Sequence, residues 1–240
     1  MDTPISSDRL LPTAPDPLRS AAQAMEAVRR NCVWSARITH RDLVPYLVEE
    51  SAELIDAVEA GSRSDVREEL GDLLWQVLFH SAVAADDPDE PFDIDDVARD
   101  LTDKMVRRHP HVFAGAVATT PEEVLVHWNA AKAAEKRSRT SVLDGVSPHM
   151  PSLALAQKVL GRAATIGVSP SPTRNLPPEN DVSPARPVAS GRGEPATEAE
   201  LGEALLALVA TARAHGWDAE RALRERLRGV EADVRAAEGS

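Results

Sequence analysis

Four carboxylates in two short segments have the types and spacing to do chemistry. Glu50 and Glu53 lie in the segment EESAE, and Glu69 and Asp72 lie in the segment EELGD. The members of each pair are three positions apart in a helical pattern, so they share one helix face with Cβ atoms roughly 5–6 Å apart. Two such helices laid antiparallel would direct all four into one small space, where like charges repel unless a cation lies between them. Oxygen-only ligands suit the hard cations Mg²⁺ and Mn²⁺.

The same carboxylates also fit an ordinary solvated face on two acidic helices, and spacing alone leaves both interpretations open. Two features favour a cation. Glu53, Glu69 and Asp72 are each followed by a leucine of an apolar stripe, which places them near the edge of the core. Basic neighbours are also few in both segments. A di-iron or di-manganese centre is a poorer match, because bundles of that kind place a histidine three positions after a glutamate.

A second set of residues is basic and aromatic. Lys104 and Arg108 lie four positions apart in one expected helix, and Trp128 and Lys132 lie four apart in the next. Lysine and arginine donate hydrogen bonds to phosphate oxygens, and a tryptophan one turn from a lysine could stack on a base. A solvated basic face beside a core tryptophan is the alternative interpretation. The spacing of this set leaves both open.

Composition limits the class of protein. The chain has 240 residues, of which 42% are hydrophobic and 3% aromatic, and its net charge is −12. The acidic balance argues against a nucleic-acid surface. Cys32 is the one cysteine, so no disulfide forms within the chain, consistent with a reducing cytoplasm. The first residues lack a signal-peptide pattern, and the longest apolar segment, residues 73–85, is too short and too polar to span a membrane.

Apolar residues at helical spacing predict an all-α fold. In the segment 42–60 the expected core stripe is Leu43, Leu47, Leu54, Ile55 and Val58. In the segment 94–109 the expected core face is Val97, Leu101 and Met105. Pro45 is expected in the first turn of that helix, where no backbone donor is needed. Ser62 or Ser64, Asp93 and Thr120 are expected to cap the helices that follow them. The expected helices span residues 18–34, 42–60, 65–85, 94–109, 120–137, 197–215 and 218–237.

The composition changes sharply between about residues 168 and 197. That segment is rich in proline, serine and glycine, which predicts a flexible linker. Beyond the linker, ELGEALLALV (200–209) resembles ELGDLLWQVL (69–78). The similarity indicates a duplication whose second copy has decayed. That copy has no equivalent of EESAE, whose place the linker takes.

The segment EESAELIDAVEAGSRSDVREELGDLLWQVLFHSAVA resembles the signature of MazG-type nucleoside triphosphate pyrophosphohydrolases, which is E-E-x-x-E, a spacer and then E-x-x-D. Two downstream segments, KMVRRHPHVF and HWNAAKAAEKR, are also similar to MazG segments and follow in the right order. The resemblance covers residues 18–165 and, weakly, residues 198–237. One departure is CVWSARITH (32–40), where the family often has CPWD-x-x-Q-T; Trp34 and Thr39 remain.

The resemblance implies a four-helix-bundle-like fold that assembles as a homodimer or larger oligomer, often with helices of two chains around each site. It implies Mg²⁺-dependent hydrolysis of an NTP or dNTP to the monophosphate and pyrophosphate, as nucleotide-pool house-cleaning, with Mn²⁺ as a substitute. By position, the metal ligands and catalytic residues correspond to Glu50, Glu53, Glu69 and Asp72, and the nucleotide contacts to Lys104, Arg108, Trp128 and Lys132.

The expected organisation is a tail (1–17), a catalytic domain (18–165), a linker (166–196) and a degenerate second pair of helices (197–240). The degenerate copy is expected to be inactive, which leaves one catalytic site in the first half of the chain. The expected partners are nucleoside triphosphates and a second copy of the chain, with no nucleic acid and no membrane. The alternative function is a catalytically inactive helical dimer that binds nucleotides or proteins.

Overall fold

The computed structural model describes residues 16–135, 140–168 and 195–239, and within them every regular element is a helix. The all-α class predicted from the sequence is therefore confirmed. The chain divides into two compact units, Met1–Glu135 and Lys136–Ser240. None of the helices described is long and apolar enough to cross a membrane. The predicted tail and linker fall almost entirely outside the described residues.

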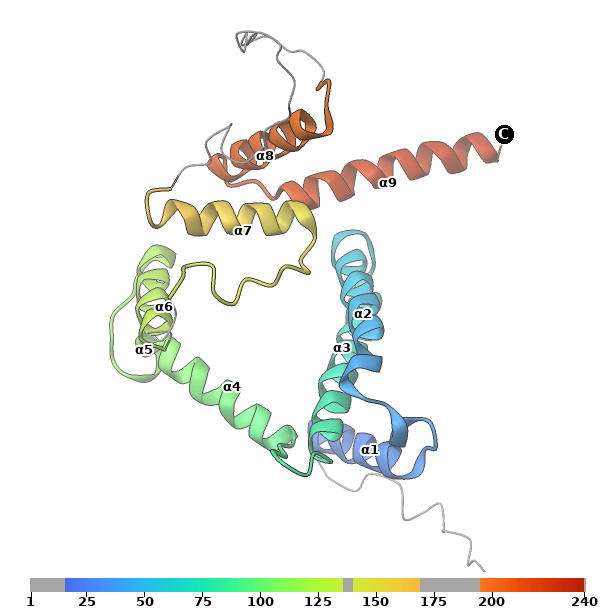
Figure 1. Ribbon diagram of the computed structural model, residues 1–240. Coiled ribbons are helices and arrows are strands. Elements are labelled where there is room, and N and C mark those ends of the chain that lie inside the picture. Colours follow the sequence, from blue (N-terminus) through green and yellow to red (C-terminus); the bar gives the residue numbers. More distant parts are fainter. Residues whose placement is uncertain (1–15, 136–139, 169–194, 240) are drawn as a thin grey trace, which may run out of the picture. The chain divides into compact units, whose positions relative to one another are not determined.

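In the part of the first unit that the structure describes, residues 16–135, there are six α-helices and one short 3₁₀ helix. Figure 1 shows their order along the chain. Their starts follow from local sequence, because a side chain before each of three helices accepts a backbone N–H that the helix leaves unpaired. Thr39, Ser62 and Asp93 each form a capping box with the acidic residue three positions on. The elements are α1 (Pro17–Asn31), η2 (Ser35–Arg37), α2 (His40–Ala60), α3 (Arg63–Ala84), α4 (Ile94–Arg108), α5 (Pro110–Phe113) and α6 (Pro121–Glu135).

Two helices, α2 and α3, each begin two residues earlier than expected. Helix α2 begins at His40 because Thr39 and Asp42 form the capping box there. Pro45 consequently lies inside the helix and not in its first turn. A proline in a helix interior has no N–H to donate to the carbonyl four residues earlier. The periodicity located the helix, but the cap decided where it begins.

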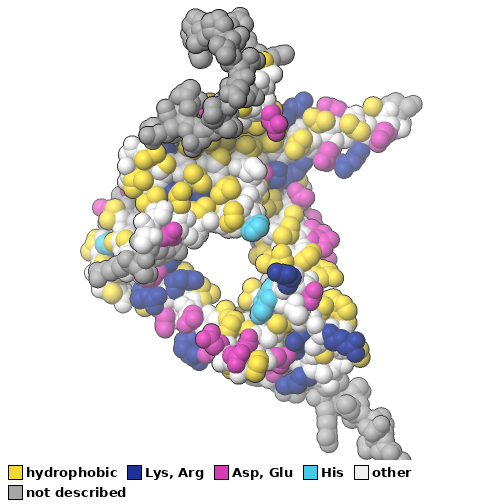
Figure 2. All heavy atoms as spheres, in the orientation of Figure 1, with side chains coloured by type: hydrophobic (Ala, Val, Ile, Leu, Met, Phe, Trp, Pro, Cys, Tyr) yellow, Lys and Arg dark blue, Asp and Glu magenta, His cyan; other side chains and the backbone are white. Residues whose placement is uncertain are grey.

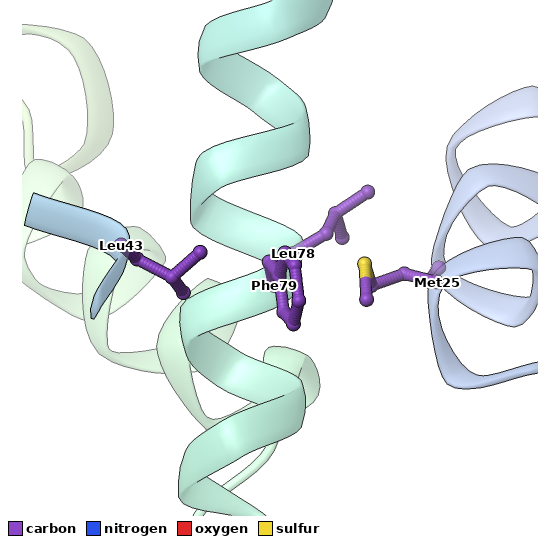
Figure 3. Packing of buried hydrophobic residues seen from close by; sticks show 5 residues of the cluster. Met25, Leu43, Leu78 and Phe79 are labelled. Carbon is purple, nitrogen blue, oxygen red and sulfur yellow. The ribbon is translucent and has the colours of Figure 1, made fainter. Parts of the chain in front are cut away.

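The core of the first unit lies where α1, α2 and α3 meet. Met25 of α1, Leu43 of α2, and Leu78 and Phe79 of α3 are almost fully buried and contact one another (Figure 3). Ile94, the first residue of α4, packs against this cluster. The cluster thus anchors one end of α2 and α3 and the beginning of α4. The carboxylates lie further along this helix pair, after Leu43 in α2 and before Leu78 in α3.

Several positions predicted to face a core are instead exposed in the first unit. Val58 of α2 is 65% exposed and Leu101 of α4 is 51% exposed. Helix α4 has no buried residue. Figure 2 shows apolar side chains at the surface of the molecule. The helical period correctly identified apolar faces, but the packing of this unit leaves parts of them uncovered.

The second unit contains α7 (Ser152–Ala164), α8 (Glu198–Ala214) and α9 (Ala219–Glu238). Leu160 of α7 and Val209 of α8 are buried between the helices. The amide of Gln157 donates to the carbonyl of Trp217 at 2.7 Å and accepts from the backbone N–H of Ala219 at 3.0 Å, which ties α7 to the start of α9. Helix α7 belongs to this compact unit, although residues 152–164 were expected within a catalytic domain ending at 165. The domain limits stay predictions.

Candidate metal and nucleotide site

A tight connection brings the two acidic helices side by side. Helices α2 and α3 pack along each other and are joined by Gly61 and Ser62. A Cβ at Gly61 would lie 2.8 Å from the Cα and the carbonyl oxygen of Ala57, so only glycine lets the chain turn this closely. A connection of two residues makes the helices antiparallel neighbours. This hairpin is what places the two carboxylate pairs opposite each other.

Three of the four predicted carboxylates come together in the hairpin. Glu50 of α2 and Glu69 and Asp72 of α3 each offer an oxygen atom, and these atoms all lie within 4.8 Å of one another. Glu50 and Glu69 are half-buried, whereas Asp72 is exposed. Glu53 is exposed on the next turn of α2 and is not a member of this group. The spacing argument therefore brought together three of the four residues it named.

The electrostatics of the cluster are unfavourable in the absence of a cation. Burial raises the pKa of Glu50 above its ordinary value, and the charges of Asp72 and Glu53 raise it further. Burial also raises the pKa of Glu69, as do the charges of Glu53 and Asp72. One oxygen of Glu69, Oε2, is buried with no hydrogen-bond partner. An unpaired buried carboxylate oxygen among like charges costs free energy that a cation would offset.

The donor set fits a hard cation. All of the donors are carboxylate oxygens, the type that Mg²⁺ and Mn²⁺ prefer. Two ligands on opposite sides of a Mg²⁺ ion at roughly 2.1 Å each are separated by about 4.2 Å. The oxygen atoms of Glu50, Glu69 and Asp72, within 4.8 Å of one another, span a comparable distance. The orphaned oxygen of Glu69 is the observation that favours a cation over a solvated acidic face.

Two polar residues continue the acidic face of α3, and the sequence argument did not include them in the site. Gln76 is buried, and its side chain hydrogen-bonds Glu50. The Oε1 atom of Gln76 itself has no hydrogen-bond partner. One turn further, His80 stacks on His40 of α2 with their Nδ1 atoms 2.7 Å apart. The available signal was the four-residue step from Asp72 to Gln76 and then to His80, which interrupts an otherwise apolar run.

Arg108 and Trp128 of the predicted nucleotide set meet between α4 and α6. The Arg108 guanidinium lies 4.9 Å from the centroid of the Trp128 ring. It also donates to Oε2 of Glu135, from Nε at 3.2 Å and from Nη2 at 2.5 Å. The Arg108 side chain is only 12% exposed. Arg108, with Arg107, also holds the pKa of Glu135 below its ordinary value. The sequence argument missed Glu135, although it lies one turn after Lys132.

The acidic and basic sets lie on different pairs of helices. The carboxylates are on α2 and α3, whereas Lys104 and Arg108 are on α4 and Trp128 and Lys132 on α6. Lys104 and Lys132 are both half-buried. Helix α4 starts at the core through Ile94 and an Arg19–Asp95 ion pair, and Figure 1 shows it leading away from α3 to α5 and α6. The structure thus brings together residues within each set but does not join the two sets.

Comparison with protein families gives one match. A family model described as the MazG nucleotide pyrophosphohydrolase domain matches residues 38–113. That range includes all four predicted carboxylates, together with Lys104 and Arg108 of the predicted nucleotide set. It ends before Trp128 and Lys132. The match therefore covers α2, α3 and α4, which carry the acidic residues and half of the basic set.

Curated relatives extend the similarity over most of the chain. An uncharacterised 26.1 kDa protein in the blaB 3′ region of Streptomyces cacaoi is 46% identical over 92% of this chain and 83% of its own length. The nucleoside triphosphate pyrophosphohydrolase of Escherichia coli K12 is 34% identical over 88% of this chain and 81% of its own length. The protein of the same name from Mycobacterium tuberculosis H37Rv is 44% identical over 74% of this chain, and the match spans 54% of that relative's length.

Proposed function

Because the chain belongs to the MazG nucleotide pyrophosphohydrolase family, we propose that it hydrolyses nucleoside triphosphates to the nucleoside monophosphate and pyrophosphate at the carboxylates of the α2–α3 hairpin. One observation carries this assignment. Glu50, Glu69 and Asp72 converge within 4.8 Å, and Glu69 keeps a buried oxygen without a partner. A purely structural role gives no reason to hold these like charges together.

Glu50, Glu69 and Asp72, with Glu53 one turn away, are the residues that would hold Mg²⁺, or Mn²⁺ in its place. When bound, such a cation supplies positive charge for the triphosphate and makes a bound water more acidic. The exposed Glu53 side chain is placed beside this cluster. In this proposal Glu53 accepts the proton of the water that attacks the α-phosphorus, while the bond from that phosphorus to the pyrophosphate oxygen breaks. Glu49 is the second candidate for this base.

Lys104, Arg108, Trp128 and Lys132 are the proposed nucleotide contacts. Arg108 is held in place by Glu135 and by the ring of Trp128. A planar guanidinium fixed in this way is prepared to form paired hydrogen bonds with phosphate oxygens. The indole of Trp128 would stack on the base. In this proposal Glu135 orients Arg108 and remains its partner when the substrate is bound.

We propose that a second copy of the chain completes the site, since one chain keeps the acidic and basic sets on separate helix pairs. Apolar side chains on the outer faces of α2 and α3, among them Val58, Leu70 and Val77, are exposed. A methyl group added at Gly71 of α3 would meet no other described atom within 4 Å. Exposed apolar faces of this extent mark a protein interface. A homodimer would cover them and bring the basic set of one copy to the carboxylates of the other.

The proposed physiological role is house-cleaning of the nucleotide pool in the cytoplasm. The net charge of −12 and the absence of a strongly basic composition favour free nucleotides over nucleic acids as substrates. The single cysteine, Cys32, is compatible with a reducing compartment. Negative charge around the cluster also means that the triphosphate would approach as a complex with its cation.

Product identification tests the proposed reaction. The protein is incubated with Mg²⁺ and each of the common NTPs and dNTPs, and the products are separated by anion-exchange chromatography. The expected products are nucleoside monophosphate and pyrophosphate in equal amounts, with no product in EDTA. Release of orthophosphate and a diphosphate would contradict attack at the α-phosphorus. No turnover of any nucleotide would favour the inactive helical dimer instead.

A further inference from the structure

Helix α9 carries a row of exposed apolar side chains that the nucleotide site does not use. Leu223, Leu227, Val230 and Val234 are each between 41% and 50% exposed. The helix is 20 residues long, packs against α7 and α8, and is joined to α7 by hydrogen bonds at Ala219 and Glu220 in its first turn. The four apolar side chains stay exposed in this packing, so they are available to another molecule. We call these four residues the α9 seam.

The spacing of the α9 seam is that of a coiled coil. Its members are separated by four, three and four positions, which is the alternation of the a and d positions of a heptad. Leu223 and Val230 occupy d positions, and Leu227 and Val234 occupy a positions. Side chains at this spacing form one narrow line on a helix, which matches a second helix and not a broad core. A partner with the same spacing is the simplest occupant.

The flanking charges identify that partner and its direction. Arg226 and Asp233 occupy successive g positions beside the seam. When two copies of α9 pair antiparallel, g positions face g positions, so Arg226 of each copy faces Asp233 of the other. In a parallel pair a g position faces the e position five residues on, which would place Arg226 opposite Glu231, an attractive contact, but Asp233 opposite Glu238, a repulsive one. Charges at e and g set partner and orientation in coiled coils, and here the antiparallel pair is the one in which Arg226 and Asp233 both meet an opposite charge.

We propose that α9 pairs antiparallel with α9 of a second copy of this chain, through the α9 seam and two Arg226–Asp233 contacts. Leu223 of one copy then packs against Val234 of the other, and Leu227 packs against Val230. This contact is distinct from the proposed homodimer of the first unit, because it uses neither α2 nor α3. It gives the degenerate second unit a role in assembly that needs no catalytic residue.

Site-specific disulfide formation tests the pairing in the full-length chain. All variants carry Cys32→Ser, so that the one native thiol is absent. Leu223→Cys protein is mixed with Val234→Cys protein in an oxidising glutathione buffer, and cross-linked dimer is measured on non-reducing gels. Antiparallel pairing brings these two positions within the distance that a disulfide spans. Residue 223 of one copy and residue 223 of the other are then offset by eleven residues, about 16 Å along the helix axis, which is too far for a disulfide.

The expected result is at least tenfold more cross-linked dimer from the mixture than from either variant alone. The matched control mixes Glu225→Cys, which lies on the opposite face of α9, with Val234→Cys. Equal yields from the mixture and this control would overturn the proposal. Faster cross-linking of each variant with itself would also overturn it, since that is the signature of a parallel pair. The cross-linking yield does not depend on nucleotide hydrolysis. A negative cross-linking result would therefore contradict the α9 pairing without contradicting the proposed function.

Charge reversal gives a second test that does not depend on oxidation efficiency. Adding Arg226→Asp to the Leu223→Cys chain alone, or Asp233→Arg to the Val234→Cys chain alone, places like charges in contact and should lower the yield severalfold. With both changes present, opposite charges face each other at both contacts again, and the yield should recover. A yield that stays the same in the single charge variants would contradict the assigned orientation. So would a yield that does not recover when both changes are present, in protein that circular dichroism shows to be helical.

Discussion

Helices α3 and α8 contain nearly the same segment, residues 69–78 and 200–209, and use it differently. In α3, Glu69 is half-buried in a cluster of like charges and keeps an oxygen without a partner. In α8, the corresponding Glu200 accepts a hydrogen bond from the backbone N–H of Ala196 at 2.7 Å, just before the helix begins. Asp72 belongs to the acidic cluster, whereas its counterpart Glu203 belongs to no such group among the described residues. The same motif thus has a buried carboxylate oxygen without a hydrogen-bond partner in the first unit and a hydrogen-bonded carboxylate in the second.

The neighbouring helix explains the difference. Helix α3 packs against α2, which presents Glu50 to it, whereas α8 packs against α7, whose residues 152–164 include no acidic side chain. An E-x-x-D or E-x-x-E pair alone is therefore an ordinary helix surface. It becomes a candidate cation site when an opposing helix adds a carboxylate at the edge of a core. Five substitutions test whether this distinction separates function from structure.

The largest expected effect is on hydrolysis. Asp72→Asn should lower kcat/KM about a thousandfold, since losing a cation ligand removes several kcal/mol of charge stabilisation in the transition state. Glu203→Gln, the matched change in α8, should leave kcat/KM within about twofold of the wild type. Steady-state pyrophosphate release measures both. Similar losses from the two variants would mean that the second unit takes part in the reaction.

A smaller loss of activity is expected when Gln76, one turn after Asp72 in α3, is replaced by the alanine that α8 has at the corresponding position. Gln76 corresponds in alignment to Ala207. Gln76→Ala removes the hydrogen bond to Glu50, and loss of a group that orients a metal ligand typically costs about 10–100-fold in activity or metal affinity. The Mg²⁺ concentration for half-maximal activity should rise with it. Unchanged activity and Mg²⁺ dependence would assign Gln76 to packing alone.

Stability should respond with opposite sign in the two helices. In EDTA, Glu69→Gln should raise the melting temperature, because it removes one charge from a repelling cluster. Glu200→Gln should lower the free energy of unfolding by about 0.5–1 kcal/mol, because it weakens the bond that caps α8. Thermal unfolding followed by circular dichroism measures both. A destabilising Glu69→Gln would show that the cluster is satisfied without a cation.

The smallest effect is a pH dependence of the cation-free protein. The folded-state pKa values of Glu50 and Glu69 are raised above the ordinary glutamate value of 4.5. The folded state therefore binds these protons more tightly than the unfolded state does, so stability is fully present below pH 4.5 and falls as the pH rises through the folded values. The decline should be shallower in Glu69→Gln and unaltered in Glu203→Gln. Denaturant titrations in EDTA between pH 4 and pH 7 measure it.

Local chemistry explains what the sequence could predict. Helical periodicity, together with capping residues such as Ser62 and Asp93, located the elements, and the all-α class is confirmed. The resemblance to MazG-type pyrophosphohydrolases and the enzyme class it implies are confirmed at the level of the family. Spacing also brought Glu50, Glu69 and Asp72 together. These features depend on neighbours within a turn or two, on the short connection between α2 and α3, or on a motif that resembles a known family signature.

Features that depend on distant neighbours could not be predicted in this way. The period of α2 and α4 identified apolar faces but not what covers them, so Val58 and Leu101 were assigned to a core and are exposed. The contact of Arg108 with Glu135 joins residues 27 positions apart on different helices, which no helical spacing encodes. Gln76 was visible only as one polar residue in an apolar run, and its contact with Glu50 required the packing of α2 on α3.

Direct titration of the divalent cation tests the central claim, that the α2–α3 carboxylates form a cation site and their α8 counterparts do not. Isothermal titration calorimetry with Mn²⁺ is carried out on the wild type, Asp72→Asn and Glu203→Gln, each without nucleotide. Saturable binding is predicted for the wild type and for Glu203→Gln, and a loss of at least tenfold in affinity for Asp72→Asn. Mn²⁺ binding that is unchanged in Asp72→Asn, or absent from the wild type, would contradict the account.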